Sequence, residues 1–213
     1  MAITKRHIID KTYFFLRQEV KFFSSSEVYS VIENDAFRRI AEDIDYPKAN
    51  YSSVLSSGEY IVSSPADFLK IDQNWSPVFK DAAGTRDLTP TTSISRATLL
   101  SATPGSPQEY TEWNETQFAI HPPSTSGICV LPYVKNPSML SGDADTNELT
   151  ENCYMAAVYY TVQECMMKDN DPRAQYWEGK YNAEIGRLRK RFNEKYEVGF
   201  DMTPARDYLR ENT

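Results

Sequence analysis

The sequence is poor in the residues that most often carry chemistry. Its 213 residues include only two histidines, His7 and His121, and three cysteines, none of them in a CxxC pair. Neither histidine has neighbours at the spacing of a zinc motif, and a serine or cysteine nucleophile needs an adjacent base, usually histidine. Unpaired cysteines predict reduced, buried thiols. These shortages argue against a zinc site and against a serine or cysteine hydrolase.

Long hydrophobic segments and glycine-rich loops are also missing. No apolar run approaches the roughly 20 residues needed to span a bilayer. The N-terminal MAITKRHIIDKTYFF has charges on both sides of Ile8 and Ile9 instead of a signal-peptide core. No segment matches the GxxxxGKS or GxxxxGKT loop that holds nucleotide phosphates. We therefore expect a chain made in a cytoplasm, with no membrane span and no cofactor.

Positive charge is in deficit as well. The chain has 30 acidic residues against 23 lysines and arginines, a formal net charge of −7. Proteins that bind nucleic acid without sequence preference usually present a basic face that neutralises phosphates. The balance therefore argues against a general nucleic-acid binder. With 40% apolar residues, the chain is nevertheless able to bury one sizeable core.

The residues that are present divide the chain into helical ends and a β-like middle. Apolar positions at helical spacing predict a first helix from Ile9, and a capping box at Ser24 and Glu27 predicts a second helix that closes at Pro47. Between Tyr51 and Leu140, proline, serine, threonine and short apolar runs predict strands, turns and a short helical piece near 95–102. The candidate strands are 59–62, 68–72, 76–79, 117–121 and 127–133.

The C-terminal part predicts two further helices. Asp145 and Glu148 form a second capping box, and the apolar run from Cys153 to Val162 indicates a buried central helix. The strongest periodic stripe follows, with Ala174, Trp177, Tyr181, Ile185, Leu188, Phe192 and Tyr196. We predict an α+β fold: a helical bundle of two N-terminal helices and a C-terminal helical hairpin, with a proline-rich β-like insertion. The predicted boundaries are 1–50, 51–142, 143–198 and a tail at 199–213.

The segment KDNDPRAQ between the last two helices raises the alternative of a metal loop. Asp171 occupies an N-cap position and Pro172 the first helical position, where its missing N–H has no cost. A calcium loop needs glycine at its sixth position and glutamate at its twelfth. A run starting at Asp143 has Glu148 and Tyr154 there instead. We therefore predict a hairpin joint and no metal.

Two segments are candidates for contact with another protein. The basic run Arg187, Arg189, Lys190 and Arg191 is either a solvated helical face or a contact for an acidic partner. The last segment has spaced apolar anchors in a polar context and is either a frayed end or a tail that orders on docking. Its anchors are Phe200, Met202, Tyr208 and Leu209.

The order of elements resembles the head-to-tail adaptor, or connector, proteins of tailed bacteriophages. The matching pieces follow one another along the chain. They are Gly105, Pro107 and Tyr110; Ile120-His121-Pro122-Pro123; Tyr133, Pro137 and Leu140; and Asp171-Pro172-Arg173-Ala174. The segments 81–95 and beyond 197 match nothing in the family pattern.

The resemblance implies a non-enzymatic virion protein at the capsid–tail junction. Such adaptors assemble as a homo-oligomeric ring, commonly a dodecamer, beneath the portal protein. The ring extends the DNA channel and offers a platform for tail or nozzle proteins. The bundle is then expected to pack laterally, the β-like part to face outward or toward the tail, and the C-terminal tail to dock on the portal. Another head-closure or tail-completion protein, or a cell-wall hydrolase using two carboxylates, are the alternatives.

Overall fold

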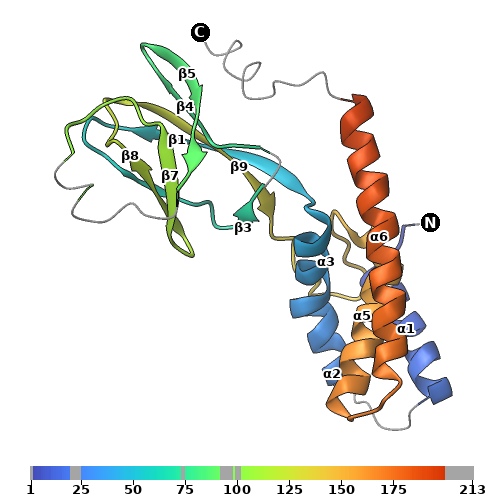
Figure 1. Ribbon diagram of the computed structural model, residues 1–213. Coiled ribbons are helices and arrows are strands. Elements are labelled where there is room, and N and C mark those ends of the chain that lie inside the picture. Colours follow the sequence, from blue (N-terminus) through green and yellow to red (C-terminus); the bar gives the residue numbers. More distant parts are fainter. Residues whose placement is uncertain (1, 20–24, 73–74, 92–97, 99–101, 200–213) are drawn as a thin grey trace. The chain divides into compact units, whose positions relative to one another are not determined.

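The computed structural model describes residues 2–19, 25–72, 75–91, 98 and 102–199 (Figure 1). Two compact units emerge from the chain. The helical unit lies within Met1–Pro47 and Asn136–Phe200, and the β unit comprises the described residues of Lys48–Lys135. The four-part division of the chain given above stays a prediction.

The helical unit is built around one long helix. α5 (Thr150–Lys168) contacts α1 (Lys5–Glu19), α3 (Phe37–Ile44) and α6 (Ala174–Gly199). Small residues let its neighbours approach closely, because Ala156 and Ala157 are fully buried. The stripe predicted on α6 is buried from Ala174 to Phe192 as the spacing requires. The core of this unit therefore runs along α5.

The N-terminal helices depart from the two predicted. α2 (Ser25–Ser30), the π-helix η1 (Val31–Ala36) and α3 form a succession of different helical turns where one helix was expected. α3 ends because Asp45 adopts a left-handed conformation and its N–H bonds to the carbonyl of Ala41. Ser24 of the predicted capping box lies outside the described residues.

The predicted cap of α5 at Asp145 is wrong. α5 begins at Thr150, and the Asn147 side chain accepts hydrogen bonds from the Leu149 N–H at 3.0 Å and the Thr150 hydroxyl at 2.8 Å. Asp145 instead accepts the N–H of Gly142 at 2.6 Å and closes its own loop. Asp145 therefore bonds within a turn of its own, because α5 begins five residues after it.

The β unit contains two sheets (Figure 1). The β9 sheet consists of β1 (Lys48–Leu55), β9 (Gly127–Lys135), β4 (Val78–Asp81) and β5 (Gly84–Asp87) in that order, with β3 (Phe68–Ile71) also on β9. The β8 sheet has the order β2, β8, β7 and β6. Its strands are Ile61–Ser63, Gln117–His121, Glu109–Asn114 and Thr89–Pro90.

The two sheets share one hydrophobic core. Phe79 and Leu131 from the β9 sheet meet Phe118 and Ile120 from the β8 sheet. Burying each such side chain contributes roughly 1.5–3 kcal/mol, so this cluster gives the β unit a core of its own. At Gly127 a Cβ would collide with the Lys80 carbonyl oxygen and lie 2.7 Å from Phe79 Cζ, so only glycine lets β4 approach β9.

The fold class predicted from the sequence is wrong. The middle of the chain is not a proline-rich insertion of edge strands: its described residues form nine strands in two packed sheets. The N-terminal part is also not a pair of helices.

Proline misled the prediction, because Pro132 lies within the central strand β9. It falls between the residues paired with β4 and those paired with β3, where its missing N–H breaks no ladder bond.

Candidate interaction surfaces

Groups that could carry chemistry are buried or dispersed. Within the described part of the chain, no three His, Cys, Asp or Glu side chains gather closely enough to hold a metal ion. Cys129, Cys153 and Cys165 are buried. Burial raises the pKa of Cys129 and of Cys153 to about 12, so both stay protonated thiols at neutral pH. Nor does any helix among these residues combine the length and apolarity of a bilayer span.

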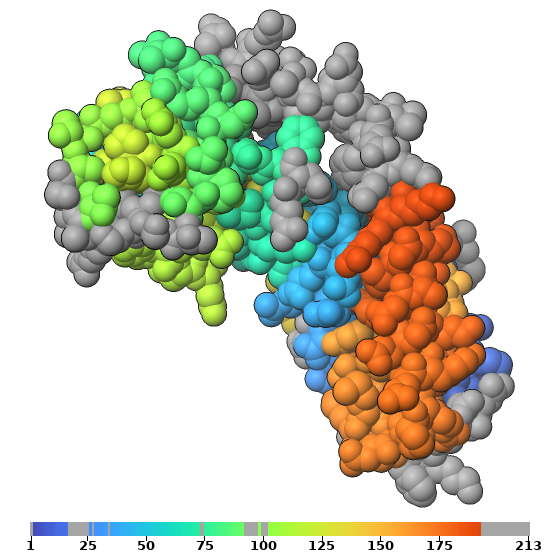
Figure 2. All heavy atoms as spheres, in the orientation of Figure 1, coloured from blue at the N-terminus to red at the C-terminus, as the bar shows by residue number. Residues whose placement is uncertain are grey.

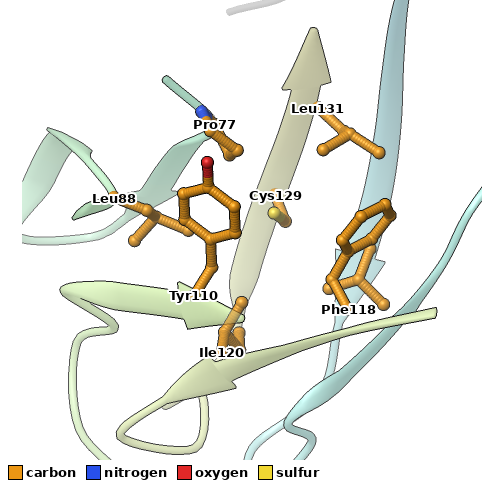
Figure 3. A pocket seen from close by; sticks show the side chains of 8 residues that line it. Pro77, Leu88, Tyr110, Phe118, Ile120, Cys129 and Leu131 are labelled. Carbon is orange, nitrogen blue, oxygen red and sulfur yellow. The ribbon is translucent and has the colours of Figure 1, made fainter. Parts of the chain in front are cut away.

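A small cavity inside the β unit is a packing gap. Side chains of both sheets point into it, among them Tyr110, Phe118, Ile120, Cys129 and Leu131 (Figure 3). Its volume is about 10 Å³. That is about the least space that one water occupies, and water enters only where polar partners exist. The cavity therefore lacks the size of a ligand site.

The joint between α5 and α6 is closed by its own side chains. The Asp171 carboxylate accepts the backbone N–H of Arg173 at 2.9 Å and also binds the Arg173 guanidinium. The N–H of Ala174 bonds to the Asp171 carbonyl at 3.0 Å. Arg173 lowers the pKa of Asp171 to about 2. Asp171 binds the backbone as a cap would, but α6 begins three residues later, at Ala174, so Pro172 is not its first residue. The aspartate is engaged by a cation of the protein itself.

The basic run predicted as a partner contact lies along α6. Arg187 Nε donates to Glu184 at 2.9 Å, and Arg189 Nε donates to the backbone carbonyl of Asp43 at the end of α3. Of these two contacts, the Arg187 pair lies within α6, and the Arg189 bond links α6 to α3. All four residues are exposed: Arg187, Arg189, Lys190 and Arg191. Figure 2 shows α6, in orange to red, at the surface of the helical unit. Their contact with a partner stays a prediction.

The C-terminal anchors predicted to dock on another chain lie outside the described residues. They are Phe200, Met202, Tyr208 and Leu209. Their role stays a prediction that rests on the spacing of apolar residues in a polar segment.

A cluster of aromatic rings on the helical unit was not singled out from the sequence. We name it the aromatic patch: Phe14, Phe15, Tyr159, Tyr176 and Trp177. The centroids of Phe15 and Trp177 are 5.0 Å apart, and those of Phe14 and Phe15 are 5.6 Å apart. Tyr176 stands edge-on to Trp177 at 5.3 Å. These separations favour ring–ring attraction across α1, α5 and α6.

The outer members of the aromatic patch face solvent. Phe14 is 52% exposed and Tyr176 is 59% exposed. Lys11 lies 5.1 Å from the Phe14 ring centroid and Lys180 lies 5.4 Å from that of Tyr176, both as cation–π contacts. Large aromatic surface with lysines at its rim is typical of a protein interface.

A usable signal for the aromatic patch exists in the sequence. Phe14-Phe15 and Tyr176-Trp177 are adjacent aromatic pairs on predicted helices. Successive residues of a helix point about 100° apart, so the two rings of a pair lie at different depths when the apolar stripe is centred on one of them. In both pairs the second ring lies on the predicted stripe or next to it, and the first ring is the candidate for the surface.

Comparison with known proteins assigns the chain to a family. No curated protein matches the sequence. The model of the SU10 adaptor protein family, however, matches residues 18–206, which cover most of both units. The resemblance to bacteriophage adaptors is confirmed, and the chain belongs to the SU10 adaptor protein family, a family of phage head-to-tail adaptors.

Proposed function

We propose that the chain assembles as a ring between the portal and the tail of a phage, as a non-enzymatic part of the virion. The family match over residues 18–206 carries this proposal. The ring is a dodecamer that extends the DNA channel and presents a platform to tail or nozzle proteins. DNA passes through its lumen without sequence-specific binding. Closed rings form through heterologous interfaces, in which two different faces of each copy meet.

The aromatic patch is the surface that we assign to lateral contact between helical units. Phe14 and Tyr176 leave large rings in water, and burying such rings dominates the energetics of most interfaces. Lys11 and Lys180 at the rim keep the free chain soluble and steer approach. Because the two exposed rings, Phe14 and Tyr176, lie on α1 and α6, this contact involves the helical unit alone.

The C-terminal segment and the basic run are the surfaces that we assign to the portal. Phe200, Met202, Tyr208 and Leu209 supply apolar anchors to a segment that cannot bury them by itself. Lys190 and Arg191 at the exposed end of the basic run add a positive surface for an acidic partner.

The net charge of −7 fits a channel through which DNA slides. Acidic side chains on the lumen repel phosphates and prevent the genome from adhering. Neutralising them should slow ejection, and an unchanged ejection rate would refute this part of the proposal.

Sedimentation of the purified chain, alone and with its portal protein, tests the assignment. We expect a discrete ring-on-ring complex with the intact chain and none when residues 200–213 are removed. Phe14→Ala with Tyr176→Ala should lower ring formation at least tenfold, whereas Met139→Ala, an exposed apolar residue outside the aromatic patch, should not.

Two results would redirect the proposal. A chain that ignores the portal at micromolar concentration would fit another head-closure or tail-completion protein better. Clearing of a peptidoglycan suspension would favour a hydrolase and contradict the non-enzymatic role.

A further inference from the structure

The outer edge of β1 is an open template for another strand. All eight residues of β1 pair with β9 without a bulge. In an antiparallel pair, alternate residues direct their N–H and C=O away from the partner. Among the described residues, no backbone hydrogen bond reaches this side of Ala49–Leu55. Beyond Lys48 the strand has no charge and no proline, the usual protections of a sheet edge.

The opposite edge of the β9 sheet is formed by β5, which pairs only with β4 in the described part of the chain. The strand registers place residues of the two edges in the same row across the sheet. Val54 is opposite Ile128, Ile128 is opposite Lys80, and Lys80 is opposite Thr85. Residues in one such row share a face of the sheet. Val54 and Thr85 therefore lie on the same face, one at each edge, and both are exposed.

The strand directions of the two edges are complementary. β1 and β4 are both antiparallel to β9 and therefore parallel to each other, and β5 is antiparallel to β4. When a second copy is placed beside the first in the plane of the β9 sheet, its β5 therefore runs antiparallel to β1 of the first copy.

We propose that β5 of one copy pairs antiparallel with β1 of the next, with Thr85 opposite Val54 and Asp87 opposite Ser52. The β9 sheets of neighbouring copies then form one continuous sheet. This pairing rests on the proposed function, because it needs a ring. It explains why Val54 is left 79% exposed on a regular strand: its β-branched side chain gains a β-branched partner across the interface.

A cysteine pair tests this register directly. Residues directly opposite each other in an antiparallel ladder have Cα atoms about 4.5–5.5 Å apart, within the range that a disulfide spans. Val54→Cys with Thr85→Cys, assembled with the portal protein and then oxidised, should give a ladder of covalent oligomers on a denaturing gel. The native cysteines are buried and do not compete.

Matched controls separate the pairing from chance collisions. Each single variant should give no ladder. Ser53→Cys with Thr85→Cys should also give none, because neighbouring residues of a strand point to opposite faces. Reduced rings of the Val54 and Thr85 double variant that sediment normally but stay unlinked on oxidation would overturn the pairing and leave the proposed function intact. Failure of the unaltered chain to form rings would remove both.

Discussion

The two units leave different kinds of surface unsatisfied. The helical unit exposes aromatic side chains at Phe14 and Tyr176, whereas Phe68 of the β unit packs against Phe118, with ring centroids 5.4 Å apart. A helix satisfies its backbone hydrogen bonds internally, so its sides can bind another protein only through side chains. An edge strand such as β1 has a face of open peptide groups even when its side chains are polar. One chain can therefore offer two binding chemistries.

The largest expected effect tests whether the units have separate cores. Phe79 in the β unit and Leu188 in the helical unit are both fully buried. Phe79→Ala should cost about 3–5 kcal/mol and Leu188→Ala about 2–5 kcal/mol of unfolding free energy. Amide hydrogen exchange should show lost protection in β9 but not α5 for the first variant, and the reverse for the second. Equal losses in both units would mean that they unfold as one.

Each unit also has a buried ion pair, and these should differ. Glu33 pairs with Lys5, whose side chain is 3% exposed, and Asp72 pairs at 2.7 Å with Lys48, whose side chain is 18% exposed. Glu33→Ala leaves the Lys5 ammonium buried with the Ser141 carbonyl at 3.1 Å.

We expect Glu33→Ala to cost about 3 kcal/mol and Asp72→Ala about 1–2 kcal/mol, because the Lys48 ammonium reaches water more easily. Urea unfolding measures both. As a control, Glu42→Ala removes the surface pairs with Arg38 and Arg39 and should cost under about 1 kcal/mol. A larger loss at Asp72 than at Glu33 would contradict this ranking.

Two buried tyrosines, one in each unit, should make the stability of both units depend on pH in alkali. Tyr133 donates to Asp67 at 2.8 Å in the β unit, and Tyr181 donates to Asp43 at 2.6 Å in the helical unit. Burial and the carboxylate raise the pKa of Tyr133 to about 12, and they raise that of Tyr181 as well. A raised folded-state pKa gives stability that is complete below about pH 10, the ordinary tyrosine value, and is lost as the pH rises through the folded value.

Replacing either tyrosine by phenylalanine should cost about 1 kcal/mol at pH 7 and flatten the loss of stability above pH 10. Urea unfolding between pH 7 and 12 measures both effects. An unchanged alkaline slope in the Tyr133→Phe variant would show that its phenol is not protected by the fold.

The smallest effect concerns the helical hairpin alone. The lowered pKa of Asp171, near 2, means that its contribution is complete above the unfolded value near 3.9 and is lost as the pH falls toward 2. Asp171→Ala should slightly lower the urea midpoint of the helical signal at pH 7 but not at pH 2. Asp171→Asn keeps a capping oxygen and should have less effect. A loss at pH 2 equal to that at pH 7 would refute the role of the charge.

Sequence patterns located what spacing within one segment determines. The stripe on α6 is a repeat within one helix, and the Asp171 carboxylate bonds to Arg173, two residues further on. β1 was missed because KANYSSVL is mostly polar, and only its pairing with β9 makes it a strand. Proline counts misled because Pro132 is tolerated by a gap between two strands far apart in sequence. The aromatic patch combines α1 with α6, which no local window contains.

The β unit begins and ends in a single ladder. Lys48, at the start of β1, is opposite Val134, next to the last residue of β9. Paired residues of this kind are about 4.5–5.5 Å apart, a gap that two or three residues can bridge. A gene encoding this chain could therefore lose everything between Pro47 and Asn136, or exchange it for another module, without rerouting the helices.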